Sequence, residues 1–199
     1  PDFLTAIKFI NALREVNVTV HRATSDFTVS GRSYPAGSFV VFTAQAFRPH
    51  VLDMFEPQDH PNVIPYPNAP PTPPYDNAGW TLAFQMGVQF DRILEPFRGP
   101  FEKVTEWNVK PSPSAIAGGS ASGSLVLDRR QNDAYLALNR MFAGKARQVA
   151  ASQESFFVLA DRKLEESLTS LGISLRRGTM TGSVALRAPG SLKPTRSAP

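Results

Sequence analysis

The three histidines are the first residues to consider as metal ligands. His50 and Asp53 are one helical turn apart, and His60 follows in a proline-rich stretch. A zinc site needs ligands that converge from fixed elements, as HxxE or HExxH patterns provide, and the sequence contains neither pattern. We therefore expect exposed or core-packed histidines, with His21 in a strand. The sequence predicts no metal-binding or cofactor-binding residue.

Motifs for nucleophilic or nucleotide chemistry are also missing from the sequence. Gly119–Gly123 reads GSASG, with alanine where the GxSxG nucleophile elbow requires serine. There is no GxGxxG, no GxxxxGK[ST] and no cysteine. Acid–base catalysis would need two carboxylates that converge in a cleft, but the candidates also fit helix caps or strand exits. These candidates are Asp76, Asp91, Asp128 and Asp133. We predict no catalytic residue.

A small set of aromatic and charged residues could recognise another domain. Arg48, Tyr75 and Trp80 belong to types that are enriched in protein interfaces, and Asp76 follows Tyr75 directly. Packing into the core is the favoured alternative for Trp80, whereas the two interpretations are balanced for Arg48 and Tyr75. We predict that these four residues form a contact between domains.

The composition indicates a globular chain. It has 199 residues, of which 42% are hydrophobic, and no apolar run is long enough to span a membrane. The net charge of +4 combines −2 in residues 1–99 (seven basic, nine acidic) with +6 in residues 100–199 (fourteen basic, eight acidic). The basic residues are scattered and are not interleaved with aromatic residues, which disfavours nucleic-acid binding.

The elements expected in the first half begin with a helix that Asp2 caps and that ends near Glu15. Period-two patterns and turn residues then predict a strand at 16–21, a hairpin at 26–35 around Ser30-Gly31 and a buried strand at 38–43. A helix at 44–55 is expected to kink or start late at Pro49. An irregular proline-rich loop covers 56–73, followed by a buried helix at 74–88 and a strand at 88–93.

The second half repeats this order after a Gly/Ser/Ala-rich stretch at 111–123, which we interpret as a mobile linker. A strand at 124–127 precedes a helix that starts at Asn132 or Asp133. A shift of 128 residues places VTVHRAT on ARQVAAS, and a shift of 117 places SFVV on SFFV.

These matches predict an α/β fold with two diverged strand–helix–strand–strand–helix units, whose parallel or mixed sheets are flanked by helices. The first unit (1–110) would lack its opening strand, which suggests a chain cut upstream of Pro1. The second unit covers 124–187, and a disordered tail covers 188–199.

The segments RATSDFTVSGRSYPAGSFVVFTAQAFRPHVLDMFEPQ and PPTPPYDNAGWTLAFQMGV resemble the region that follows the catalytic domain in large secreted bacterial zinc carboxypeptidase-like peptidases. The likeness covers about residues 1–104 and is weaker in SLVLDRRQNDAYLALNRMF and SFFVLADRKLEESLTSLG. In that family, the peptidase domain lies on the N-terminal side and binds zinc through an HxxE pair and a later histidine. No residue of this sequence matches those motifs, so none is assigned their role.

The resemblance implies a non-catalytic accessory segment that positions or stabilises the peptidase domain of the same polypeptide. It also implies a secreted or periplasmic location and zinc in the peptidase domain. One alternative is an independent small-ligand or peptide-binding module that holds its ligand at helix N-termini. A second alternative is an unrecognised hydrolase, which a buried cluster of Asp, His and Arg in a cleft would favour.

Overall fold

The computed structural model describes residues 2–75, 79–118, 124–143, 149–159, 162–178 and, for the backbone, 184–186. The chain forms two compact units. The N-terminal unit comprises residues 6–109, and the C-terminal unit comprises residues 1–5 and 110–199. Helix α1 (Phe3–Glu15) therefore starts among residues of the C-terminal unit and continues into the N-terminal one.

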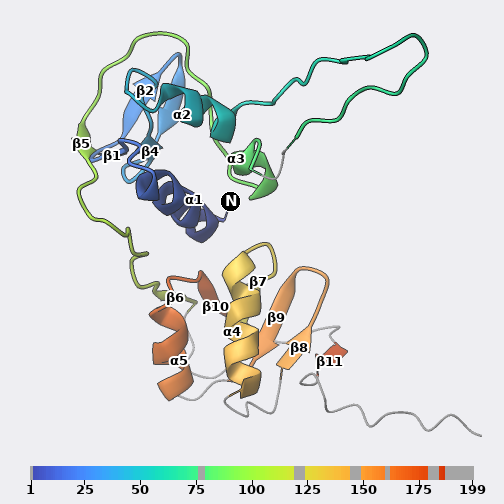
Figure 1. Ribbon diagram of the computed structural model, residues 1–199. Coiled ribbons are helices and arrows are strands. Elements are labelled where there is room, and N and C mark those ends of the chain that lie inside the picture. Colours follow the sequence, from blue (N-terminus) through green and yellow to red (C-terminus); the bar gives the residue numbers. More distant parts are fainter. Residues whose placement is uncertain are drawn as a thin grey trace, which may run out of the picture. The chain divides into compact units, whose positions relative to one another are not determined.

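The C-terminal unit is built on one mixed sheet with the strand order β11-β8-β9-β7-β10-β6 (Figure 1). Its strands and helices, in chain order, are β6 (Ile116–Ala117), β7 (Ser124–Asp128), α4 (Asn132–Ala143), β8 (Val149–Ala151), β9 (Ser155–Val158), α5 (Arg162–Thr169), β10 (Leu175–Gly178) and β11 (Val184–Leu186). All neighbouring pairs are antiparallel except β10 and β6. From β7 to β10, the connectivity is βαββαβ, as in ferredoxin-like units. This confirms the predicted α/β class.

The sequence of β7 explains its central position. Leu125 and Leu127 are fully buried in the main core of the unit, which contains residues of α4 and α5, while Val126 packs in a smaller cluster with Ala150 and Phe157. A strand that is apolar at three successive positions can be buried on both faces of a sheet. Helix α4 covers one face with a stripe of buried residues at helical spacing. They are Ala134, Ala137, Leu138 and Met141.

Two helices of the chain begin around one carboxylate. Asp2 accepts a hydrogen bond from the Thr5 amide at 3.2 Å, which confirms it as the cap of α1. Its second carboxylate oxygen accepts bonds from the Thr5 hydroxyl at 2.7 Å and from the Asn132 amide at 2.8 Å. Asp2 therefore satisfies otherwise unpaired amides at the starts of both α1 and α4.

The predicted linker at 111–123 is partly a sheet element. Ile116 and Ala117 form β6, which pairs in parallel with Leu175 and Arg176 of β10. Gly118 follows with φ = 98°, and a side chain there would meet the Arg177 carbonyl oxygen at 3.3 Å. The prediction of a mobile connection was wrong for this part because pairing with β10 orders a segment that its composition does not mark. Residues 119–123 and the predicted tail 188–199 lie outside the described residues.

The N-terminal unit contains a three-stranded antiparallel sheet, β4-β1-β5, and a separate β2-β3 hairpin. Its elements after α1 are β1 (His21–Ala23), β2 (Phe27–Val29), β3 (Arg32–Tyr34), β4 (Phe39–Val40), α2 (Arg48–Phe55), α3 (Leu82–Gln85) and β5 (Phe101–Lys103). The predicted hairpin is confirmed, with Ser30 and Gly31 at positive φ. The late start of α2 is also confirmed, with Pro49 in its first turn.

The core of the N-terminal unit joins α1 to the sheet and to α2. Its buried side chains include Phe9, Leu13 and Val20, and the Phe9 ring contacts Phe55 edge-on at 5.0 Å. Strand β1 begins at His21, later than predicted, but Val18 and Val20 before it are buried in alternation as expected. An aromatic cluster comprises Phe27, Phe42, Phe97 and Phe101, with neighbouring ring centroids 4.8–6.5 Å apart.

The predicted buried helix at 74–88 is mostly absent from the described part of that range. Helix α3 has four residues, of which Ala83 alone is buried, and Phe84 is more than half exposed. Thr81, at φ = 51°, stands before its first turn, and Gly87, at φ = 67°, lies after its last. Left-handed residues on both sides limit the helix to one turn. The apolar residues of this stretch alternate along the sequence, a pattern that already disfavoured a long helix.

The predicted strand at 88–93 is not formed, because none of the described strands pairs with it. Val88 and Phe90 nevertheless pack against the core, and the Phe90 ring contacts Phe55 at 5.1 Å. The segment therefore has the side-chain alternation of a strand without the neighbour that a strand requires.

The order helix–strand–strand–helix occurs in both units, as α1-β1-β4-α2 and as α4-β8-β9-α5. In both, the two strands pair antiparallel. The pairing registers differ by one residue: His21 opposes Val40, whereas the 128 and 117 shifts would place it opposite Val41, as Val149 opposes Val158. The two shifts therefore do not both hold for this strand pair. Among the described helices, none has the length and apolar character to cross a membrane.

Candidate functional site

The predicted contact residues lie in the N-terminal unit but do not form one cluster. Arg48 is exposed at the start of α2 and donates a hydrogen bond to the Thr43 hydroxyl at 3.2 Å. Tyr75 is fully exposed, and Asp76 lies outside the described residues. Trp80 is half-buried and stacks on His60 with ring centroids 6.3 Å apart. No hydrogen bond, ion pair or ring contact joins Arg48, Tyr75 and Trp80 within the described residues.

The partial burial of Trp80 argues against the interpretation that its ring packs in the core. Its ring is neither in the core nor in a helix, and its carbonyl accepts a hydrogen bond from the Gln85 side chain at 2.6 Å. Full burial would make Trp80→Ala cost about 3 to 5 kcal/mol of stability. A half-buried ring loses less contact area when it is removed, so we expect Trp80→Ala to lower the stability by less than this. We therefore consider Trp80 a surface residue.

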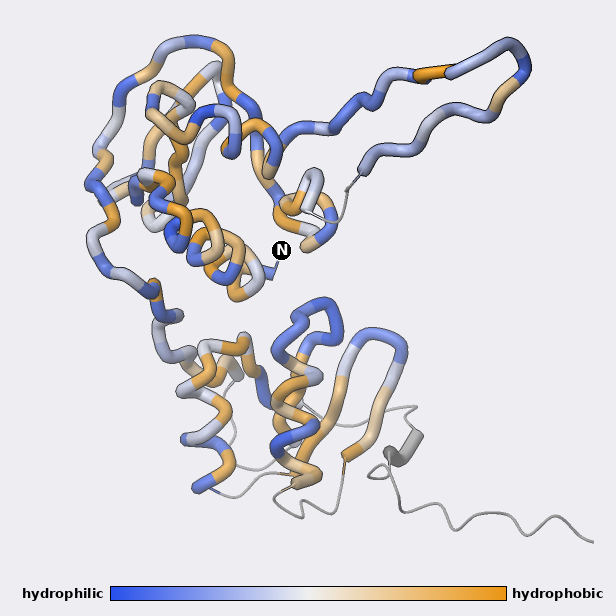
Figure 2. Tube along the Cα trace, viewed as in Figure 1, coloured by the Kyte–Doolittle hydropathy of each residue, from blue (hydrophilic) through white to orange (hydrophobic). Residues whose placement is uncertain are grey.

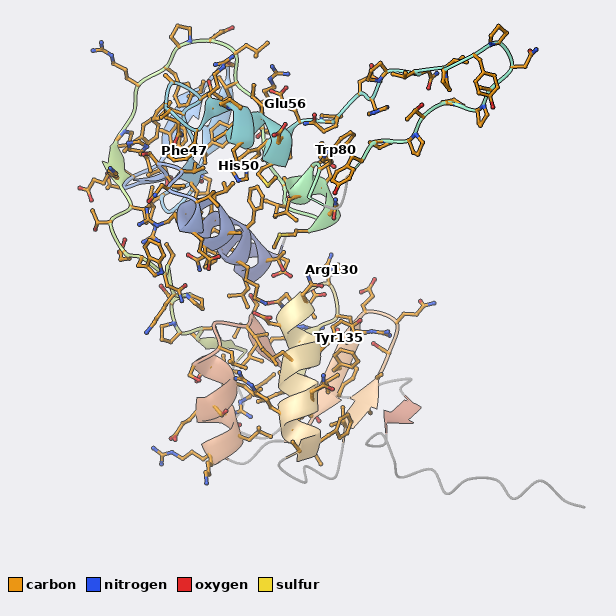
Figure 3. All side chains as sticks on the ribbon, in the orientation of Figure 1. Phe47, His50, Glu56, Trp80, Arg130 and Tyr135 are labelled. Carbon is orange, nitrogen blue, oxygen red and sulfur yellow. The ribbon has the colours of Figure 1, made fainter. Side chains whose placement is uncertain are left out.

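Residues 57–75 form an arm that projects from the N-terminal unit, with Glu56 and Trp80 at its two ends (Figures 1 and 3). The structure confirms the irregular proline-rich loop predicted for most of this range. The Thr72 amide bonds to the Val63 carbonyl at 2.8 Å and joins the two limbs, and the Ala69 amide bonds to the Tyr66 carbonyl at 3.0 Å and closes a turn. Prolines and these bonds order the arm without regular structure.

The arm exposes apolar side chains. Val63, Ile64 and Tyr66 are 52%, 55% and 65% exposed. Figure 2 shows the arm as largely hydrophilic with a strongly hydrophobic band. Exposed apolar residues on an ordered projection are a feature of surfaces that contact another protein.

A polar pocket of about 370 Å³ lies between the β2-β3 hairpin and residues 91–95. Arg32 bonds to the Asp91 carboxylate at 2.6 Å, and the Ser30 hydroxyl donates to Glu95 at 3.3 Å. Desolvation raises the pKa of the Tyr34 hydroxyl, and its hydrogen bond to Asp91 adds to this effect. Asp91 was predicted to be a cap or strand-exit residue, but it contacts a hairpin almost 60 residues earlier in the chain.

The charged side chains that line this pocket are typical of a polar binding site and do not form an acid–base pair. Asp91 is held by Arg32 and Tyr34, and Arg92 is paired with Glu56 at 3.0 Å. The Arg32 side chain is 67% exposed, so its ion pair is open to solvent. Among the described residues, the lining contains no histidine. The buried cluster of Asp, His and Arg that would favour a hydrolase is not found in this pocket.

The histidines occupy separate environments. His21 packs edge-on against Phe42 with ring centroids 5.2 Å apart, and its buried Nδ1 atom has no hydrogen-bond partner among the described residues. His60 stacks on Trp80. His50 is half-buried on α2. Within the described residues, no group of three or more His, Cys, Asp or Glu side chains could hold a metal ion.

The helix N-termini proposed for anion binding are partly filled from within the chain. The Thr5 and Asn132 amides, at the starts of α1 and α4, are both bound to the Asp2 carboxylate. Helix α2 has no side-chain cap, but Pro49 in its first turn has no amide hydrogen to donate. An external anion would have to displace Asp2 from α1 and α4, which disfavours these sites.

Comparison with known proteins gives no relative: no family model, no curated protein and no solved structure matches this chain.

Proposed function

We propose that this chain is a non-catalytic accessory segment of a zinc carboxypeptidase-like protein that positions or stabilises the peptidase domain of the same polypeptide. The peptidase domain would hold the zinc and carry out the proteolysis, and the protein would be secreted or periplasmic. The resemblance of the proline-rich and neighbouring segments supports this assignment. The structural observation that carries the contact role is the arm at 57–75.

The arm is suited to bind a neighbouring domain. Its prolines restrict the backbone before binding, so little conformational entropy is lost when the arm docks. Val63, Ile64 and Tyr66 present apolar surface that a partner can bury, and Tyr75 adds a fully exposed aromatic ring near the base of the arm. Tyrosine is among the residues that contribute most to binding energy in interfaces.

The test uses the parent polypeptide with Tyr66→Ala and Tyr75→Ala combined. We expect faster protease cleavage within the arm and a lower unfolding temperature of the peptidase domain, because the arm no longer docks. Trp107→Ala is the matched control, since Trp107 is 67% exposed outside the arm. Equal behaviour of the two variants would contradict the contact role. A parent reading frame without an HxxE pair and a later histidine ahead of this segment would contradict the peptidase assignment.

The polar pocket supports a second candidate, a binding module for a small polar ligand or peptide. Its lining offers two arginines and two carboxylates beside the Tyr34 hydroxyl, a set that suits a ligand with both charges, such as a free amino acid or a peptide end. We expect millimolar amino acids or dipeptides to raise the unfolding temperature of the chain, and Arg32→Ala to abolish the rise. No rise with any of these compounds would count against this candidate.

A further inference from the structure

The same short pattern has different burial in the two units. Residues 38–41 read SFVV and residues 155–158 read SFFV. All four residues of the second pattern, which is β9, are at most 9% exposed. All four of the first, which includes β4, are half-buried.

The neighbouring strand accounts for this difference. Strand β9 lies between β8 and β7, whereas β4 is the end strand of its sheet and, among the described strands, pairs with β1 alone. Strand β7 opposes the whole pattern in an antiparallel register, with Leu125 opposite Val158, Leu127 opposite Phe156 and Asp128 opposite Ser155. The described residues include no equivalent strand beside β4.

The hydrogen bonds of β4 show which side of the strand is open. The Ser38 carbonyl accepts the Ala23 amide at 2.9 Å, and the Phe42 carbonyl accepts the Gln45 side-chain amide at 2.6 Å, on the side of β1. Backbone groups alternate in direction along a strand, so those of Val41 point to the opposite side. No backbone hydrogen bond of Val41 is found within the described residues.

Both faces of the sheet at this edge present apolar side chains. Phe39 and Val41 pack against the core of the N-terminal unit, and Phe42 lies in the aromatic cluster on the other face. A strand placed here would bury side chains on both faces. It would therefore need the composition of β7, in which three successive apolar residues are buried.

We propose that the outer edge of β4 binds one further strand, antiparallel to β4 and apolar on both faces, which the parent polypeptide supplies ahead of α1. This rests on the proposed function in one respect, that the chain is part of a longer polypeptide. In the C-terminal unit, three residues (129–131) connect β7 to α4. A strand joined to α1 by a similarly short connection would be covalently linked, through α1, to the unit that contains β4.

The proposal also accounts for residues 88–93. In the C-terminal unit, β10 follows the second helix and pairs with the free side of β7. Residues 88–93 follow α2 and α3 and have the alternation of a strand, but they have no partner among the described strands. The added strand would offer them the pairing that β7 offers β10.

The test adds Ser-Leu-Val-Leu-Asp directly ahead of Pro1 in the full chain, which leaves two residues before α1, one fewer than between β7 and α4. We expect about tenfold slower amide hydrogen exchange at Val41 and a higher unfolding temperature of the N-terminal unit, because the Val41 amide gains a partner. An extension that reads Ser-Gly-Ser-Gly-Asp is the control and should change neither quantity.

Three outcomes would overturn the proposal. The apolar extension could leave Val41 exchange unchanged, it could protect Val41 no better than the control, or it could protect Val41 only in a dimer, as sedimentation would show. The last outcome would assign the edge to a second copy of the chain. Failure here leaves the accessory role standing, because that role is tested by the arm variants. As a second variant, Val41→Pro removes the amide hydrogen and should cancel the gain in unfolding temperature.

Discussion

The two units of this protein place similar strand pairs in different surroundings. In the C-terminal unit, β9 is covered by a strand on each side and by helices on one face, and its side chains are buried. In the N-terminal unit, β4 has β1 on one side among the described strands, and its side chains are only half-buried. The comparison shows that the burial of a strand depends on its neighbours as well as on its own residues.

In both units a glutamine side chain forms hydrogen bonds with backbone groups near the end of a strand pair, but the number of bonds differs. In the N-terminal unit, the Gln45 side chain bonds to the Thr19 amide at 2.7 Å, the Thr19 carbonyl at 3.2 Å and the Phe42 carbonyl at 2.6 Å, and so replaces a peptide group between two chain segments. In the C-terminal unit, Gln131 bonds to the amide and carbonyl of Ser174 at 2.9 and 3.5 Å. A side-chain amide has the same donor and acceptor as a peptide group.

The largest effect is expected at the corresponding phenylalanines. Phe156→Ala should lower the free energy of unfolding of the C-terminal unit by about 3 to 5 kcal/mol, because it leaves a cavity in a filled core. Phe39→Ala should cost the N-terminal unit less, since its side chain is only partly buried. Chemical denaturation followed by unit-specific amide exchange measures both. Equal costs would show that β4 is as well covered as β9.

An intermediate effect is expected at the two glutamines. Gln45→Ala should lower the free energy of unfolding by about 1 to 3 kcal/mol, because three partly buried backbone groups lose their partner. Gln131→Ala should cost less, since its two bonds include one of 3.5 Å. Gln45→Glu is a useful control because it keeps the acceptor and removes the donor. A larger loss for Gln131→Ala would reverse this ranking.

The smallest effect concerns pH and the end of β7, which opposes β9. A hydrogen bond from Arg130 lowers the pKa of Asp128 below its ordinary value, against a smaller opposing effect of desolvation. Because the folded pKa is lowered, this contribution to stability is present above the unfolded pKa of about 3.9 and is lost as pH falls through the folded pKa. The exposed arginine limits its size.

Asp128→Asn should therefore flatten the acid side of the stability profile of the C-terminal unit. Unfolding measured at closely spaced pH values between about 2 and 5 tests this, with Arg130→Ala as the partner variant that should have a similar effect. If stability falls as steeply with acid in Asp128→Asn as in the unaltered chain, this carboxylate does not contribute.

The sequence by itself determined the elements whose residues favour a single local structure. The period of α1 and its Asp2 cap, the turn at Ser30-Gly31 and the apolar runs of β7 and β9 each define a local structure that pairing then stabilises. The irregular, proline-rich loop was also predicted in kind, whereas the sequence left the exposure of Tyr75 undecided. Each of these depends on contacts within a few residues or on a fixed backbone angle.

The tertiary structure alone decided the features that depend on a partner far along the chain. Ile116 is a strand residue because β10 lies beside it, and residues 88–93 are not a strand because no described strand does. Trp80 is a surface residue because a one-turn helix and His60 are its neighbours. The pocket brings Asp91 to Arg32 and Tyr34 of β3, and no local pattern connects Asp91 to that strand. Hydrogen bonds and burial in a sheet are properties of pairs of segments, and a single segment does not contain its partner.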